Sequence, residues 1–418
     1  ILIGTSGLNI SRNIFYEKEL SFNVSCSYGP GRYDKNYEEK GFDYPFEYVR
    51  WTAQRNFEAI LELLSKNKVN FKSLITHKFK IDDAEKAYYL FNKKQKSLGI
   101  LIKYSNNVLP KNNKNILSLY KGKLSSISQK NNTICVGFIG AGNFAGSKLI
   151  PAFKKTGIYL KSISSNSGLS GVHLGKKFGI EETTTSTEKL ISDKNINTIV
   201  ISSRHDSHAE YVIKSLKKRK NVFVEKPLCL KKKELEEIIK VYNKVSNDSK
   251  FRPMLMVGFN RRFSPLIAKA KSLISEINVP KTFIMTVNSG YIPPNNWTQD
   301  KQIGGGRIIG EVCHFIDLLL FLNGYKIVDW NIYSLNDLTK DTVSINLMFG
   351  DGSIGTIHYF SNGSNDYQKE RLEIFSSGKI LQLNNFRNLI GFNWPNFKQK
   401  KLWIQNKGHD ECIDNFIY

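Results

Sequence analysis

The feature that most constrains the fold of this chain is an apolar stretch that ends in closely spaced glycines. Residues 134–139 lack polar alternation, as expected for a strand buried on both faces. The small residues of a Gly-x-Gly-x-x-Ala pattern follow at once, and the chain from Ala145 to Phe153 can form a helix. In this setting the free N–H groups at the helix start face a pyrophosphate, which predicts a dinucleotide site. The loop residues predicted to contact the cofactor are Gly140, Gly142, Asn143, Phe144 and Ala145.

Composition narrows the classes of protein and partner. The 418 residues suffice for two or three domains, and no apolar run approaches the ~20 residues that span a bilayer. The formal net charge is +24, but the lysines are scattered and no basic run is interleaved with aromatic residues. We therefore expect a basic surface suited to anionic small molecules and no nucleic-acid partner. Five widely separated cysteines predict reduced thiols in a cytoplasmic protein without a metal site.

Periodicity and composition divide the chain into four segments. Residues 1–104 mix strands and helices, and residues 105–132, rich in Asn, Lys and Ser, predict a linker with one short helix near 117–121. Residues 133–258 alternate strand and helix, which predicts a Rossmann fold, an α/β doubly wound parallel sheet. Residues 259–418 predict an α+β domain with a large, mainly antiparallel open sheet.

The expected elements follow the same periodicities. In the first segment we expect strands at 1–3, 19–27, 74–79 and 99–103 and helices at 55–65 and 82–91. In the third we expect strands at 134–139, 159–164, 198–202, 221–224 and 254–258, with helices at 145–153, 171–178, 207–218 and 234–245. In the fourth we expect a helix at 305–321 and strands at 343–349, 354–359, 371–375 and 380–383.

The end of the second strand of the Rossmann segment bears on the choice of cofactor. Enzymes that use NAD usually place a carboxylate there for the ribose 2′-hydroxyl. This chain has Ser165 and Asn166 and no acid at that point, so both could donate to a 2′-phosphate without charge repulsion. The sequence therefore leaves the cofactor as NAD or NADP, with NADP slightly favoured.

Five motifs in order resemble the Gfo/Idh/MocA family of sugar oxidoreductases. After the glycine loop come Ser203–His208, Glu225-Lys226-Pro227, Gly258–Phe263 and Gly304–Asp317. The resemblance covers residues 133–418. It implies hydride transfer between a nicotinamide and a sugar hydroxyl or ketone, in a substrate domain whose open sheet forms the interface of a homo-oligomer, dimer or tetramer.

The resemblance also implies roles for individual residues. Lys226 and His314 match the catalytic pair, while the family's Asp four residues before the His is replaced by Gly310. Glu311 lies three residues before His314 and is a candidate to replace that carboxylate. Further cofactor contacts are expected from Ser203, Arg204, His205, His208, Glu225 and Lys226. Apart from the resemblance, Asn260, Arg261 and Arg307 are candidates for holding an anionic substrate, since the fork of Arg suits phosphate or carboxylate. Trp297 is a candidate for stacking on a sugar ring, and His314 is expected to contact the substrate as well.

The first segment resembles a different family. Residues 75–88 are similar to the C-terminal part of zinc-type (medium-chain) alcohol dehydrogenases, whose glycine loop and zinc ligands have no counterpart here, so His77 and Cys26 are not expected to bind metal. Both chain ends are typical of a fragment. The combination resembles bi-domain oxidoreductases of bacterial surface-polysaccharide clusters, which implies a nucleotide-sugar substrate. The alternatives are a cyclitol or free-sugar dehydrogenase and a catalytically silent NAD(P)-binding subunit.

Overall fold

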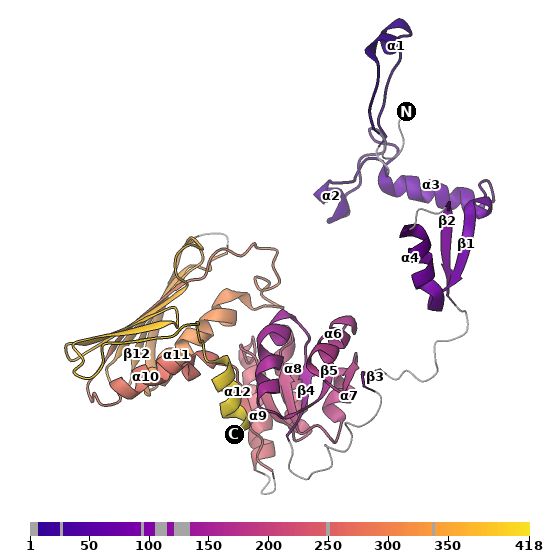
Figure 1. The fold of residues 1–418 in the computed structure, drawn as a ribbon. Coiled ribbons are helices and arrows are strands. Elements are labelled where there is room, and N and C mark those ends of the chain that lie inside the picture. Colours follow the sequence, from indigo (N-terminus) through magenta and orange to yellow (C-terminus); the bar gives the residue numbers. More distant parts are fainter. Residues whose placement is uncertain are drawn as a thin grey trace. The chain divides into compact units, whose positions relative to one another are not determined.

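The chain forms two compact units, residues 1–113 and residues 114–418, in a computed structural model (Figure 1). The structure describes residues 7–25, 28–92, 96–104, 115–120, 134–247, 251–336 and 339–418. The strand predicted at residues 1–3, Cys26 and most of the predicted linker lie outside these ranges. The described helices include none that is long and apolar enough to cross a membrane, and the described side chains form no cluster of metal ligands.

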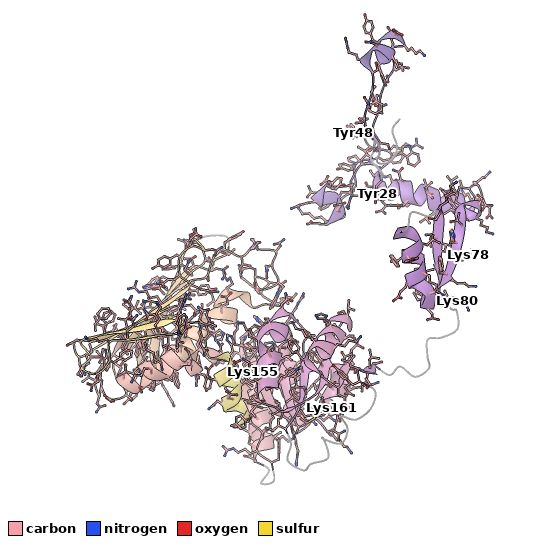
Figure 2. The ribbon with its side chains drawn as sticks, in the orientation of Figure 1. Tyr28, Tyr48, Lys78, Lys80, Lys155 and Lys161 are labelled. Atoms are coloured by element: carbon pink, nitrogen blue, oxygen red, sulfur yellow. The ribbon has the colours of Figure 1, made fainter. Side chains whose placement is uncertain are left out.

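The N-terminal unit is a small α/β arrangement. Its elements are α1 (Arg12–Glu17), α2 (Lys35–Glu38), α3 (Ala53–Ser65), η1 (Lys72–Leu74), β1 (Ile75–Lys80), η2 (Ile81–Asp83), α4 (Ala84–Asn92) and β2 (Gly99–Lys103). Strands β1 and β2 pair in parallel, as their connection through a helix requires. Lys78 and Lys80, labelled in Figure 2, lie on the exposed side of β1. The two helices and two strands predicted between residues 55 and 103 are confirmed.

One prediction for this unit is wrong in its described part. Residues 19–25 were expected to begin a strand, but only Val24 has a single bridge contact. A strand needs a neighbouring strand to satisfy its backbone N–H and C=O groups. The paired strands of this unit are β1 and β2, which pair with each other.

The second unit begins with a seven-stranded sheet in the order β3-β6-β5-β4-β7-β8-β9. Its strands are β3 (Ile116–Ser118), β4 (Cys135–Ile139), β5 (Tyr159–Ser164), β6 (Glu182–Thr184), β7 (Thr198–Ile201), β8 (Asn221–Val224) and β9 (Leu255–Val257). All neighbours run parallel except the antiparallel pair β3 and β6. The fully buried β4 lies at the centre of the order, so the predicted doubly wound sheet is confirmed.

The edge of this sheet corrects the short helix predicted within the linker. A helix was expected near residues 117–121, but residues 116–118 form β3 and pair with residues 182–184 of β6. An isolated turn of helix is marginal, whereas the open edge of β6 offers unpaired backbone groups. Residues 116–118 are therefore part of the second unit. Strand β6 and helix α7 (Thr187–Ser192) were not predicted.

The helices of the Rossmann domain pack on both faces of the sheet (Figure 1). They are α5 (Ile150–Lys155), preceded by the π-helical turn η3 (Ala145–Leu149), then α6 (Leu169–Phe178), α7, the turn η4 (His205–Ser207), α8 (His208–Lys217) and α9 (Lys232–Ser246). The last helix of the chain, α12 (His409–Ile417), returns to this domain. Phe416 packs edge-to-face with Phe153 and Phe223, and Lys155 (Figure 2) pairs with Asp410.

The C-terminal domain is an eight-stranded sheet in the order β11-β12-β13-β10-β14-β15-β16-β17, antiparallel except for β10 with β13. Its strands are β10 (Thr282–Asn288), β11 (Ile327–Ser334), β12 (Val343–Phe349), β13 (Ile354–Phe360), β14 (Glu370–Ser376), β15 (Lys379–Asn384), β16 (Asn388–Phe392) and β17 (Gln399–Lys401). The helices are η5 (Asn260–Phe263), α10 (Pro265–Ile274), η6 (Ile308–Val312) and α11 (Cys313–Asn323). Helices α10 and α11 share one apolar core with the sheet, so the predicted open sheet is confirmed.

Candidate active site

The glycine loop after β4 has the shape that a pyrophosphate requires. Gly140 has φ +105°, and a Cβ there would lie 2.6 Å from the carbonyl oxygen of Ser202. A Cβ on Gly142 would meet nothing within 4 Å, so the backbone is open to close approach. At Gly146, on the first turn of the helix, a Cβ would lie 2.7 Å from Leu174. These contacts fit a dinucleotide on this loop, as in other Rossmann domains.

The neighbouring side chains predicted to contact the cofactor divide into exposed and structural groups. Asn143 and Phe144 are exposed at the loop, and Ala145 is buried beneath it. Ser165 is buried, and its hydroxyl oxygen accepts a hydrogen bond of 3.1 Å from the backbone N–H of Gly171. Asn166 is exposed at the end of β5. Of the two polar residues at this strand end, Asn166 is therefore the freer to contact a ribose.

Lys226, directly after β8, reaches the helix that carries the predicted catalytic histidine. Its ammonium donates a hydrogen bond of 2.7 Å to the carbonyl oxygen of Gly310. Gly310 belongs to the π-helical turn η6, and such wide turns are frequent at functional sites. The contact joins the Rossmann sheet to the C-terminal domain. Glu225, the residue before Lys226, is largely withdrawn from water, which raises its pKa to about 7.

His314 lies on the first turn of α11 and is 6% exposed. Its ring packs edge-to-face on Phe259 at 5.8 Å, and its Nδ1 has no hydrogen-bond partner within the described part of the chain. Burial, together with the charges of Arg261 and Lys226, holds the pKa of His314 well below its ordinary value. The ring is therefore neutral near pH 7 and can accept a proton or a hydrogen bond.

Glu311 does not contact His314; its carboxylate binds other side chains. Its carboxylate accepts a hydrogen bond of 3.1 Å from Arg307 and one of 2.7 Å from the hydroxyl of Tyr359 on β13. Burial opposes its ionisation, but the guanidinium of Arg307 and the Tyr359 hydroxyl outweigh burial and lower the pKa of Glu311. Both of its oxygens are thus engaged in holding the helix to the sheet. From their spacing in the sequence we expected Glu311 to reach His314, but the structure does not bring the two side chains together.

Three residues predicted to bind an anionic substrate serve the interior of the domain instead. Arg261 forms a bidentate pair with Glu370, whose side chain is fully buried. Arg307 is 1% exposed and donates to the carbonyl oxygens of Gly290 and Ser289 as well as to Glu311. Asn260 is buried and donates to the carbonyl oxygen of Lys407 at 2.8 Å. These internal contacts hold all three side chains within the domain.

A cluster of rings borders the site on the side of Lys226. His205 packs edge-to-face on Trp297 at 5.0 Å and on His208 at 5.6 Å, and the guanidinium of Arg204 lies 5.8 Å from the Trp297 ring centre. Buried His208 contacts the carbonyl oxygens of Pro227 and Ser203, and thereby ties the two strand ends together. The sequence placed these residues at the cofactor edge but gave no indication that Trp297 joins them.

Glu370, Phe259 and Tyr359 are the partners of Arg261, His314 and Glu311 respectively. Phe259 lies within the motif Gly258–Phe263 but was given no role from the sequence. Glu370 and Tyr359 had no sequence signal, because no spacing links their strands to the site. The hydroxyls of Ser203 and Ser207 lie 2.6 Å apart, so Ser203 is also engaged within its own turn.

Three features together are typical of a nicotinamide-dependent oxidoreductase. They are a Rossmann domain with a glycine-rich loop, a lysine after its fifth parallel strand, and a buried histidine on an adjoining helix. Residues 134–249 match the NAD-binding Rossmann domain of an oxidoreductase family, Gfo/Idh/MocA, and residues 267–382 match a C-terminal domain of the same family. Together the two ranges cover more than half of the chain. The chain belongs to the Gfo/Idh/MocA family, and its Rossmann domain is of the NAD-binding type. Neither range includes the N-terminal unit.

Several curated proteins resemble part of this chain. Myo-inositol 2-dehydrogenase of Thermotoga maritima is 27% identical over 224 residues, 51% of this chain and 64% of the relative. 1,5-Anhydro-D-fructose reductase of Ensifer adhaerens is 25% identical over 225 residues, 52% of this chain and 62% of the relative. The chain thus spans less than two thirds of the length of either protein.

Solved structures share the fold. Levoglucosan dehydrogenase in complex with NADH and levoglucosan superposes with a TM-score of 0.59 at 21% identity, over 68% of this chain and 88% of that chain. An oxidoreductase domain protein from Kribbella flavida gives a TM-score of 0.59 at 20% identity, over 65% of this chain and 80% of that chain. At such identities the similarity establishes the architecture.

Proposed function

We propose that this chain transfers hydride between NAD and a ring hydroxyl of a sugar or cyclitol. The observation that carries the proposal is the contact of Lys226 with Gly310, which sets an ammonium against the helix of His314. Both lie in the unit whose glycine loop is shaped for a dinucleotide. A cation and a neutral imidazole at the mouth of a nicotinamide site are the groups that oxidation of a carbinol needs.

Each group has a definite task in this proposal. The nicotinamide, when bound, supplies hydride acceptance or donation. Lys226 offers its remaining ammonium hydrogens to the substrate oxygen and stabilises negative charge there. His314, kept neutral by burial, accepts the hydroxyl proton during oxidation and returns it during reduction. Glu311 acts on neither atom and holds Arg307 and the helix in position.

The substrate class follows from the relatives and from the site. Myo-inositol 2-dehydrogenase, 1,5-anhydro-D-fructose reductase and levoglucosan dehydrogenase are named for polyhydroxylated rings. Arg261 and Arg307 are held by internal contacts, which favours an uncharged ring at the reacting centre. A nucleotide-linked sugar of polysaccharide synthesis is the finer proposal, and Arg204 beside Trp297 would meet its charged and planar part. Fusion to an alcohol-dehydrogenase remnant likewise belongs to that proposal.

A substrate panel tests the function. The purified full chain, supplied with NAD⁺ or NADP⁺, is given myo-inositol, levoglucosan and a uridine-diphosphate hexose, and reduced nicotinamide is followed by absorbance. We expect turnover of at least one ring polyol with NAD⁺. Tight NADH binding without turnover of any compound would favour the alternative, a silent NAD-binding subunit. Turnover only of the nucleotide sugar would select the finer proposal.

A further inference from the structure

The inference concerns His205, on the turn η4 that follows β7. His205 is half-buried and is fixed from several sides. Its Nδ1 lies 2.8 Å from the carbonyl oxygen of Gly304, and the backbone N–H of Asp206 donates to the carbonyl oxygen of Ile303 at 3.0 Å. Trp297 covers the ring at 5.0 Å. The turn η4 is therefore fastened to the loop that enters the His314 helix.

The contact with Gly304 sets the tautomer of His205. A carbonyl oxygen only accepts, so Nδ1 must carry the hydrogen, and in the neutral ring Nε2 is then a bare acceptor. Burial is the main cause that lowers the pKa of His205 to about 4, and the ammonium of Lys226 acts in the same direction. The neutral form therefore prevails near pH 7. The contact with Gly304 uses Nδ1 and leaves the lone pair of Nε2 available to a ligand.

The position of the ring depends on the absence of a side chain at Gly310. A Cβ at that position would lie 3.1 Å from Cε1 of His205, closer than ordinary van der Waals contact, and 3.5 Å from Nδ1. The carbonyl oxygen of the same residue receives the hydrogen bond from Lys226. One glycine thus brings together the ammonium, the imidazole and the helix that bears His314 four residues later.

We propose that His205 is a substrate-contacting residue, whose Nε2 accepts a hydrogen bond from a hydroxyl of the ring that Lys226 and His314 act upon. This role differs from the cofactor contact expected from the sequence, and it rests on the proposed function for the identity of the substrate. No proton moves to His205. Its ring orients the polyol, and the Cε1–Nδ1 edge of the ring lies against the space that a side chain at position 310 would fill.

A substitution with a matched control tests whether Nε2 of His205 acts as a hydrogen-bond acceptor or whether the ring only packs against its neighbours. In His205→Asn the side-chain amide keeps a donor near the position of Nδ1 and removes Nε2, and His173→Asn on the exposed side of α6 is the matched control. With myo-inositol as substrate we expect kcat/KM to fall at least ~10-fold in His205→Asn, as for loss of one substrate hydrogen bond, at unchanged melting temperature and NADH affinity. Equal kcat/KM in wild type and His205→Asn would overturn the inference and leave the proposed function intact.

A double-mutant cycle tests the link to Gly310. Gly310→Ala should lower kcat/KM in the wild-type background because the new methyl group displaces the imidazole, and should have little further effect in His205→Asn. Additive losses would show that the methyl group acts through Lys226 alone, and would overturn the role of the ring.

A measurement without turnover distinguishes failure of the two proposals. The chain has seven histidines, so ¹⁵N spectra of the histidine-labelled protein can be assigned to His205 by its loss in His205→Asn. We expect a protonated Nδ1, a bare Nε2, and a shift of the Nε2 signal when myo-inositol is added to the NADH complex. A shift without turnover contradicts the proposed function and supports the role of His205. Absence of any shift overturns the inference.

Discussion

The ammonium of Lys226 lies 2.7 Å from the carbonyl oxygen of Gly310, although 84 residues separate the two in the chain. The bond fixes one of three ammonium hydrogens and aims the remaining two away from the helix backbone. Because Gly310 is four residues before His314, the same bond sets the separation of the two groups proposed to act on the substrate. The first predictions follow from this arrangement.

Replacement of Lys226 by Ala should lower kcat by at least ~10²-fold, the lower end for a group that assists proton transfer, because the charge beside the substrate oxygen is lost. NADH affinity, measured by fluorescence titration, should change little. Lys217→Ala, at an exposed position of α8, is the control and should keep wild-type turnover. Unchanged kcat in Lys226→Ala would remove this residue from the mechanism.

His314→Asn and Glu311→Gln should have different consequences. We expect His314→Asn to lose turnover by at least ~10²-fold with little effect on stability, because its Nδ1 contributes no internal hydrogen bond within the described residues. Glu311→Gln should retain most turnover but unfold at lower urea concentration, since buried Arg307 loses its charged partner. The opposite pattern, with activity in His314→Asn and none in folded Glu311→Gln, would assign the role of proton acceptor to Glu311.

The buried carboxylate of Glu370 should be a strong determinant of stability. It accepts hydrogen bonds from Arg261 at 2.7 Å and from Lys407 at 3.0 Å, and both cations lower its pKa despite burial. Glu370→Gln leaves two largely buried cations without a charged partner and should reduce the free energy of unfolding by ~3 kcal/mol. Glu373→Gln, two residues along β14 and paired with Arg371, should cost under ~1 kcal/mol by the same urea titration.

Two glycines of the cofactor loop should respond differently to a methyl group. Gly140→Ala places a Cβ 2.6 Å from a backbone oxygen at a φ of +105°, so both the melting temperature and NADH affinity should fall. Gly142→Ala meets nothing within 4 Å, so the melting temperature should stay while NADH affinity drops at least ~10-fold. Full NADH affinity in a folded Gly142→Ala variant would contradict a pyrophosphate at this loop.

Stability should decline on mild acidification. Burial lowers the pKa of His205 and of His409 to about 4, and those of His208 and His314 are also lowered. Below about pH 6.5 the unfolded chain binds more protons at these histidines than the folded chain, so their contribution is lost as the pH falls toward 4.

Glu225 acts in the opposite direction, because its pKa is raised to about 7 and its protonation favours the folded state between about pH 7 and 4.5. Burial also raises the pKa values of Glu182 and Asp317, which act in the same direction as Glu225. Four histidines against three carboxyls should still give a melting temperature that falls from pH 7 to pH 5, measured by calorimetry. His409→Gln should flatten this dependence, and a melting temperature that rises over the interval would contradict the lowered pKa values.

The sequence predicted the local part of this structure well. Uninterrupted apolar runs such as 134–139 and the 3.6-residue period of α8 report burial directly, and the glycine loop is a local motif whose backbone geometry depends on adjacent residues. Short edge elements were missed, since β3 and β6 have three residues each and their pairing is decided by the open sheet edge.

In the candidate site, too, local features were predictable from the sequence and contacts between distant residues were not. The amino-acid sequence by itself determined the Rossmann fold and the cofactor loop, and its family resemblance singled out Lys226 and His314 as candidates. Tertiary structure alone decided which polar groups remain free for a substrate. Arg261 meets Glu370 across 109 residues and His205 meets Gly304 across 99, and neither separation is set by any helical or strand period. Buried charges and donors must find partners wherever the packed core brings them, so their roles become visible only once the chain is folded.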